Sequence, residues 1–186
     1  FKNYNLVTVS DECCIPIYKN AMRLDSNNIR PTGLSRTDCL FSDVYKENCY
    51  KLFYKKHPKA RGKKIVLWAP TFRGKASSPF ILGQEDISKL KVKLGEEWYL
   101  ITKAHPHLDA KERISDSDIS TEELLPVVDI LITDYSSVIF DYILLKKPLI
   151  LFVPDYDDYI KKRGFYINYE SIPGRIVKKG EELYRE

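Results

Sequence analysis

Hydroxyl, carboxylate and cationic side chains follow directly after several apolar runs of this sequence. The clearest case is Thr133-Asp134-Tyr135-Ser136-Ser137, which follows the apolar run 128–132 and precedes an amphipathic stretch that begins at Val138. This pattern predicts a buried strand, a short polar turn and then a helix. In an open α/β sheet, ligands bind where the strands end, and hydroxyls and main-chain N–H groups at such a turn can hold a phosphate.

Three further apolar runs, 65–69, 98–103 and 149–153, also lead into polar residues. The candidates among these residues are, in chain order, Thr71, Arg73, Lys103, His105 and Arg163. Because parallel strands end at the same edge of a sheet, we expect these side chains to converge on one crevice. Cations and hydroxyls there could stabilise the charge that develops on a leaving nucleotide, and His105 could donate a proton.

Each of these residues also suits an ordinary structural role. Ser136 is as well suited to capping the following helix as to binding a ligand, and Asp134 could cap the same helix or bond the turn. Asp141, one turn into the helix, could face the crevice or solvent. His105 could be only a strand-end residue, and Arg163 only a surface residue. The predicted site therefore depends on convergence and not on any single motif.

The elements that must position these side chains follow from hydrophobic periodicity. The four apolar runs do not alternate with polar residues, which is typical of strands covered on both faces. Helices are predicted between them, over 85–94, 121–125 and 138–146. Strands that alternate with helices predict an α/β fold with a doubly wound, Rossmann-like parallel sheet.

The first third of the chain is patterned less regularly. It predicts a strand over 6–10, a helix over 12–23, an extended piece over 29–33 and a helix from Thr37 or Asp38 to Tyr54. The basic stretch 55–64 is interpreted as a linker, and a last helix is expected from Glu181.

Composition excludes several classes. The chain has 186 residues, a net charge of +4 and 44% hydrophobic residues, as expected for a globular protein. No apolar run reaches the roughly 18 residues of a membrane span. No Walker A loop or GxGxxG fingerprint occurs, which disfavours ATP hydrolysis and dinucleotide binding. The four cysteines lack zinc-site spacing and are expected to be reduced thiols. The chain starts at Phe1 and its single methionine is Met22, so we expect a piece of a longer protein.

Several linked motifs resemble one known family. In order they are Gly33-Leu34-Ser35-Arg36-Thr37-Asp38, Trp68-Ala69-Pro70-Thr71-Phe72-Arg73, Lys103-Ala104-His105-Pro106, the segment 129–142 and Arg163-Gly164-Phe165-Tyr166. Together they resemble the C-terminal half of the CDP-glycerol glycerophosphotransferases, the teichoic acid polymerase family. The resemblance implies a GT-B architecture, with residues 1–57 as the tail of the N-terminal domain and 58–186 as the Rossmann-like, donor-binding domain.

The resemblance also implies roles for individual residues. His105 would be the essential histidine of this domain, and Thr133, Ser136 and Ser137 would contact the donor phosphates. Arg73 and Arg163 would help to neutralise the pyrophosphate. The remaining donor-binding residues would be Thr71, Lys103, Asp134 and Asp141, the last on the ribose or the glycerol.

The expected partners are a CDP-linked polyol phosphate and a lipid-linked polymer acceptor, without nucleic acid. By resemblance, the protein would be cytoplasmic and peripheral on the inner face of the membrane. No cofactor or metal is expected, because arginines and main-chain N–H groups could replace a cation. The Trp-His-Gly motif of the family's N-terminal domain is absent, so the chain is expected to bind donor but to turn over poorly alone.

Two alternatives stay open at this point. The same fold could serve a sugar-nucleotide glycosyltransferase or epimerase, which selectivity for cytidine over uridine would distinguish. The chain could also be a non-catalytic nucleotide-binding module, in which case replacing His105 would leave activity unchanged.

Overall fold

The computed structural model describes residues 4–75, 78–103 and 118–185, and it divides the chain into two compact units, 1–42 and 43–186. The division falls after Ser42, whereas we predicted a boundary at 57/58 from the resemblance. The helix α2 (Asp43–Lys56) therefore belongs to the second unit, where its residues Cys49 and Phe53 are buried.

The first unit is a small α/β arrangement. Its strands β1 (Val7–Val9) and β2 (Ile29–Pro31) pair in parallel, and the helix α1 (Ile15–Met22) lies between them in the chain. The core of this unit is made of Val9, Leu24 and Ile29. The predicted helix over 12–23 begins with a 3₁₀ turn, η1 (Glu12–Cys14), which the Asp11 side chain caps by accepting from the N–H of Cys13. Further 3₁₀ turns are η2 (Ser26–Asn28) and η3 (Ser35–Phe41).

The second unit is built on a parallel sheet of five strands in the order β6-β3-β7-β8-β9. All four predicted strands are present, with bounds shifted by a residue or two. They are β3 (Lys64–Ala69), β6 (Trp98–Thr102), β7 (Ile130–Thr133) and β8 (Leu149–Phe152). The strand β9 (Arg175–Val177), which has a charged first residue and only three members, was not predicted. The α/β class with a parallel sheet is confirmed.

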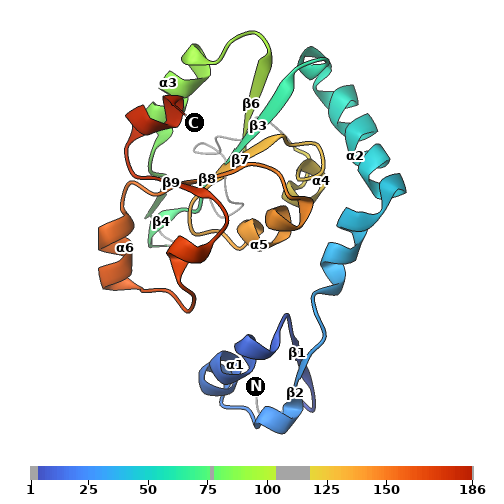
Figure 1. Cartoon of the computed structure of the whole chain (residues 1–186), viewed down its shortest axis with the longest axis vertical. Helices are drawn as coiled ribbons and strands as arrows, with labels where there is room; N and C mark the ends of the chain where they lie inside the picture. Colours follow the sequence, from blue (N-terminus) through green and yellow to red (C-terminus); the bar gives the residue numbers. More distant parts are fainter. Residues whose placement is uncertain (1–3, 76–77, 104–117, 186) are drawn as a thin grey trace. The chain divides into compact units, whose positions relative to one another are not determined.

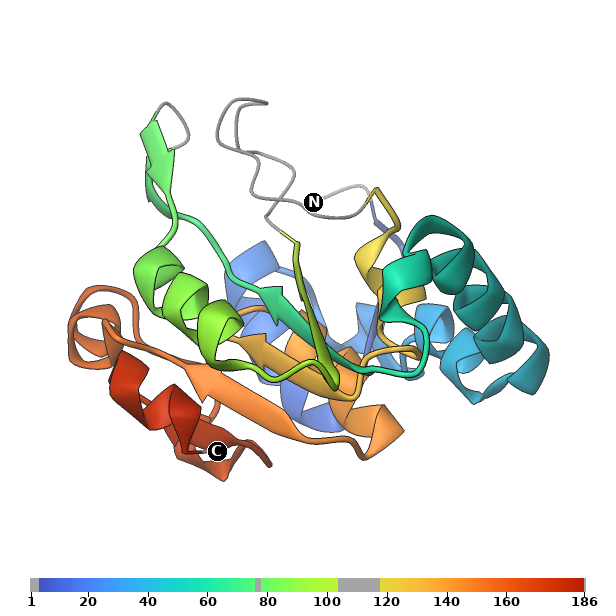
Figure 2. The ribbon, with the colours of Figure 1, turned by 90° about the horizontal axis from the view of Figure 1, so that it is seen from above.

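Successive residues of each strand point to opposite faces of the sheet, and both faces are covered. One face packs Leu67, Ile101 and Leu131 against α2, α4 (Thr121–Leu124) and α5 (Val138–Tyr142). The other face packs Val66 and Ile132 against α3 (Gln84–Lys93) and the C-terminal 3₁₀ turn η7 (Gly180–Tyr184). Figures 1 and 2 show the sheet between α3 on one side and α2 on the other. Burial on both faces explains why the strands read as continuous apolar runs.

Several predicted boundaries differ from the structure. The helix expected from residue 37 or 38 to 54 is interrupted at Ser42, between η3 and α2. The stretch 55–64 is not a solvated linker, because α2 extends to Lys56, the turn η4 (Pro58–Ala60) follows, and both His57 and Ala60 are buried. Two other features were not predicted: the helix α6 (Tyr156–Lys162) and a hairpin of β4 (Arg73–Lys75) and β5 (Ser78–Phe80).

A capping box and a lysine ammonium group stabilise the segment that leads into β7. Ser120 and Glu123 form a reciprocal capping box at the start of α4. The Lys147 ammonium donates to the carbonyl oxygens of Pro126, at 2.6 Å, and Val128, at 2.9 Å. Burial lowers the pKa of Lys147, although the negative charge of the nearby Asp129 acts to raise it. Among the described helices, none is both long and apolar enough to cross a bilayer.

Candidate active-site pocket

The carboxyl ends of the central strands lie side by side, as the sequence predicts. In the parallel register, Ala69 of β3 is opposite Thr133 of β7, and Thr133 is opposite Leu151 of β8. On the other side of β3, Trp68 is opposite Thr102 of β6. The segments that follow these four strands therefore start from one edge of the sheet.

Asp134, the first residue after β7, is a buried carboxylate that joins two of these segments. It accepts hydrogen bonds from the main-chain N–H and the hydroxyl of Thr71, both at 2.9 Å, and it lies 2.9 Å from Nη2 of Arg73. Burial raises the pKa of Asp134, while the positive charge of Arg73 and the bonds from Thr71 act in the opposite direction. Even with Arg73 beside it, the pKa of Asp134 lies above its ordinary value, because burial outweighs these favourable contacts.

Arg73 connects three segments of this edge. Its Nε and Nη2 donate to the two carboxylate oxygens of Asp155, at 2.7 and 3.2 Å, and its Nη1 donates to the hydroxyl of Thr71 at 2.6 Å. The guanidinium group also lies over the ring of Tyr135, 4.9 Å from its centroid. Burial alone would lower the pKa of Arg73, but Asp155 and Asp134 together raise it, and Arg73 in turn lowers the pKa of Asp155. The charge of Arg73 is therefore already balanced by two carboxylates.

An aromatic cluster forms the wall next to this network. Tyr135 and Tyr159 stack with ring centroids 3.7 Å apart, and Phe165 stacks on Tyr159. The Tyr135 hydroxyl donates to Asp155 at 3.1 Å, and the Tyr169 hydroxyl donates to the carbonyl oxygen of Asp134 at 2.6 Å. Burial raises the pKa of both hydroxyls, so they remain protonated donors at neutral pH. The cluster fixes the loops after β7 and β8 against each other.

A cavity of about 710 Å³ opens beside the cluster. Its polar lining includes Thr71, Arg73, Asp155, Asp158, Lys162 and Arg163. Arg163 is exposed, lies over the Tyr159 ring at 5.8 Å, and forms no ion pair with a described residue. Of the two arginines in this pocket, Arg163 is thus the one whose charge is available to an anionic ligand.

The other predicted site residues have different surroundings. Thr133 is buried and its hydroxyl donates to the carbonyl oxygen of Ala69 at 2.6 Å, which ties β7 to β3. Ser136 accepts at Oγ from the N–H of Val138 at 3.3 Å, whereas the N-cap residue of α5 is Ser137, whose side chain makes no capping hydrogen bond. Of the remaining predicted residues, Ser137 is exposed, Lys103 is half-buried and Asp141 is buried. His105 lies outside the described residues.

The carboxylates near the pocket are already engaged by cations. Asp155 and Asp157 are two residues apart, but Asp155 pairs with Arg73 and Asp157 lies 3.2 Å from Nζ of Lys178. In the described part of the chain no three His, Cys, Asp or Glu side chains form a group that could hold a metal ion. The expectation of a metal-independent enzyme stays a prediction.

Sequence reasoning missed Asp155, Tyr135 and Tyr159. Asp155 could have been found by the rule applied to the other strands, because it follows the fourth apolar run within three residues. The sequence predicts no role for the two tyrosines. No local signal distinguishes a tyrosine that lines a pocket from one that is buried, because only the packing of α6 against the loop after β7 decides it.

Comparison with known proteins places the chain in a family. The family model described as CDP-Glycerol:Poly(glycerophosphate) glycerophosphotransferase matches residues 1–186. The chain belongs to this family. It is 38% identical to a teichoic acid poly(ribitol-phosphate) polymerase of Bacillus spizizenii, over 98% of the chain and 32% of the relative. It is 35% identical to a teichoic acid glycerol-phosphate primase of Bacillus subtilis, over 100% of the chain and 49% of the relative.

Solved structures agree with this assignment. The wall teichoic acid polymerase TagF matches with a TM-score of 0.78 and 29% identity, over 98% of the chain and 48% of that protein. A TagF variant soaked with CDPG matches with a TM-score of 0.77 and 26% identity, over 97% of the chain and 45% of that protein. The likeness to this GT-B protein confirms the predicted fold. The chain spans between a third and a half of the length of these relatives.

Proposed function

We propose that this chain is the donor-binding part of a transferase that moves a polyol phosphate from a CDP-linked donor to a hydroxyl group of a growing polymer. The observation that carries the proposal is a pocket at the carboxyl edge of a parallel sheet, in a member of a family whose relatives are named polymerases and primases of polyol phosphates. Ligands of open α/β sheets bind at that edge. Glycerol and ribitol both stay possible as the polyol.

In the proposed reaction, an acceptor hydroxyl attacks the phosphorus that bears the polyol. The bond from this phosphorus to the bridging oxygen breaks, CMP leaves, and the hydroxyl proton is lost. Negative charge grows on the departing CMP, and a cation placed there in advance stabilises it. We assign this contact to Arg163, whose charge no described carboxylate balances.

Arg73 receives a different role in this proposal. Its nitrogens already donate to Asp155 and Thr71, and one of them lies next to the carboxylate of Asp134. The charge of Arg73 is therefore balanced within the protein. We therefore assign Arg73 to positioning the pocket wall and not to contacting the donor. Ser136, Ser137 and His105 are assigned to contacts with the donor phosphates, as the family resemblance suggests.

Calorimetric titration of the chain with CDP-glycerol, CDP-ribitol, CDP and UDP tests donor binding. We expect the cytidine compounds to bind more tightly than UDP. Arg163→Gln should weaken binding by at least about tenfold, because a charge-assisted hydrogen bond is worth roughly 1.5–3 kcal/mol. Lys179→Gln, an exposed lysine outside the pocket lining, is the matched control. Equal affinities for CDP and UDP, or no binding of CDP-glycerol, would count against the proposal.

Catalysis itself needs the longer protein. There, His105→Ala should abolish transfer while leaving CDP binding within a few-fold, and transfer should persist when divalent metal is chelated. A His105→Ala enzyme with undiminished activity would favour a non-catalytic module. Peripheral location on the inner face of the membrane stays a prediction, to be checked by fractionating cells that carry the longer protein.

A further inference from the structure

Positive charge is concentrated in two segments of the second unit, 55–64 and 89–97. The first has six basic and no acidic residues, and the second has three basic and two acidic residues. Together they carry a net charge of +7, whereas the whole chain carries +4, so the remaining residues are acidic on balance. The segments are neighbours in space, since the N–H of Lys64 donates to the carbonyl oxygen of Glu97 at 2.8 Å.

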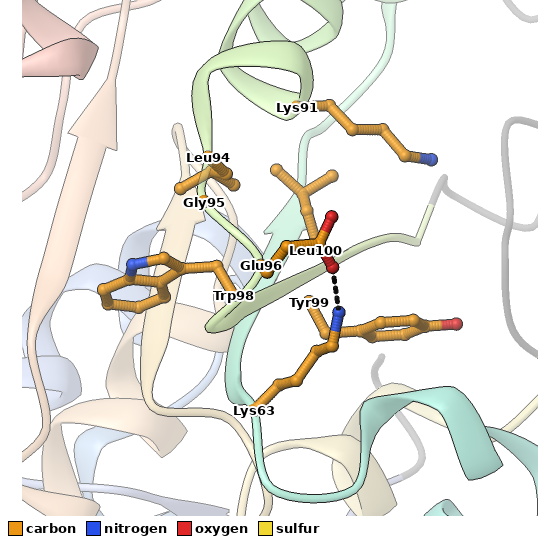
Figure 3. Close-up of a pocket in the computed structure, with 8 residues that line it drawn as sticks. All are labelled: Lys63, Lys91, Leu94, Gly95, Glu96, Trp98, Tyr99 and Leu100. Carbon is orange, nitrogen blue, oxygen red and sulfur yellow. Dashed lines mark hydrogen bonds and ion pairs between the residues drawn. The ribbon is translucent and has the colours of Figure 1, made fainter.

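The two segments meet in a hollow of about 400 Å³ at the amino-terminal end of the edge strand β6. We call this hollow the basic groove, and its side chains include Lys63, Lys91, Glu96, Trp98 and Tyr99. Figure 3 shows Lys91 and Tyr99 extending to the same side, while Lys63 reaches up to Glu96. The candidate donor pocket lies at the carboxyl ends of the strands, whereas the basic groove lies at the amino-terminal end of β6.

One ion pair in the groove, between Lys63 and Glu96, lies where an anionic ligand can compete for the lysine. Nζ of Lys63 lies 3.2 Å from Oε2 of Glu96, whose side chain is fully exposed. Lys64 lies over the Trp98 ring, 5.2 Å from its centroid. Because the Glu96 side of this ion pair is in solvent, the pair contributes little, and a multivalent anion can replace Glu96 at the half-buried Lys63.

We propose that the basic groove binds the anionic phosphodiester polymer that the proposed transfer reaction extends. This inference rests on the proposed function, because it takes its ligand from that reaction. A poly(polyol phosphate) carries a negative charge in every unit, which complements the two lysines of the groove, and its polyol carbons can pack against Tyr99, which extends to the same side as Lys91. The groove is concave, which suits a flexible chain better than the flat surface of an anionic membrane. Binding there would retain the polymer while its end is extended elsewhere.

Charge-reversal variants of the 186-residue chain test this inference. Binding of a fluorescent glycerol-phosphate hexamer is followed by anisotropy at low ionic strength and at 0.15 M salt. Lys63→Glu/Lys91→Glu should weaken binding by at least about tenfold, because each exposed contact between unit charges is worth roughly a factor of five in water. Glu96→Gln should tighten binding a few-fold, because it removes a repulsive charge and releases Lys63. Added salt should weaken binding.

Matched controls separate the groove from net charge and from the donor pocket. Lys51→Glu/Lys179→Glu changes the net charge by the same amount at exposed sites outside the groove and should leave hexamer binding within two-fold. Lys63→Gln/Lys91→Gln repeats the test without introducing acidic groups, should the reversal not fold. CDP-glycerol binding should be unchanged in all of these variants, so a chain that binds the hexamer through the groove but not CDP-glycerol would refute only the proposed function.

Three outcomes would overturn the inference. They are equal losses in the groove and control variants, no binding of the hexamer by the unaltered chain, and a dependence on Lys63 and Lys91 that appears only with phosphatidylglycerol vesicles. The last result would assign the groove to a membrane surface.

Discussion

Replacing Arg73 by glutamine tests the network at the centre of the pocket wall. The substitution removes both the ion pair to Asp134, whose side chain is 6% exposed, and the paired hydrogen bonds to Asp155. Leaving a buried carboxylate without its cation costs about 3–5 kcal/mol. Since whole domains are stable by only about 5–15 kcal/mol, Arg73→Gln should lose a large part of the stability of the second unit. Urea unfolding followed by circular dichroism at pH 7 measures this loss.

The pH dependence of the loss identifies Asp134 as its source. Arg73 is the strongest influence that lowers the pKa of Asp134, so in Arg73→Gln this pKa rises further above its value in the unfolded chain. The folded variant then binds a proton more tightly than the unfolded chain does. The destabilisation should be complete above the folded-state pKa and should shrink as the pH falls through it. Repeating the measurement at a series of lower pH values should therefore give a difference from the unaltered chain that shrinks as the pH falls.

A double variant and a matched arginine complete the test. Arg73→Gln/Asp134→Asn should recover more than half of the loss, because the buried charge is gone. Arg163→Gln, an exposed arginine of the same pocket, should cost less than about 1 kcal/mol. The interpretation is wrong if Arg73→Gln costs no more than Arg163→Gln, or if its cost does not shrink anywhere as the pH is lowered from 7.

Three further variants test the packing around the site by chemical or thermal unfolding. Gly83→Ala should cost about 1–3 kcal/mol, because the backbone has φ +84° and the new methyl group would lie 2.4 Å from Cε1 of the buried Phe152. Gly95→Ala is the control, because its methyl group would meet only a flexible glutamate. Phe53→Ala should cost about 3–5 kcal/mol and reduce the protection of main-chain amides from hydrogen exchange in the five-stranded sheet. That result would place α2 with the second unit. An effect confined to α2 would contradict this assignment. Lys147→Met should cost about 1–3 kcal/mol, because two main-chain carbonyls before β7 lose their donor, and an unchanged unfolding midpoint would show that water replaces the ammonium.

The sequence by itself determined the fold class and the end of the strands at which the candidate site lies. Both follow from short stretches of sequence, because a strand buried on two faces is a continuous apolar run and polar residues follow where that run ends. The linked motifs, read in order, also determined the family. Short elements such as β9 and the hairpin of β4 and β5 escaped prediction because three residues carry too little periodicity, and 55–64 was misjudged because its burial depends on α2 and the sheet.

Only the tertiary structure decided which charged residues are free to meet a ligand. Arg73 and Arg163 look alike in the sequence, each following an apolar run, yet Arg73 is balanced by Asp134 and Asp155, and Asp155 lies 82 residues further along the chain. Thr133, also a candidate ligand, uses its hydroxyl to bond β3. Whether a polar group is available depends on its desolvation and on its partners, which the fold brings together from distant positions, so residue type and spacing alone could not reveal it.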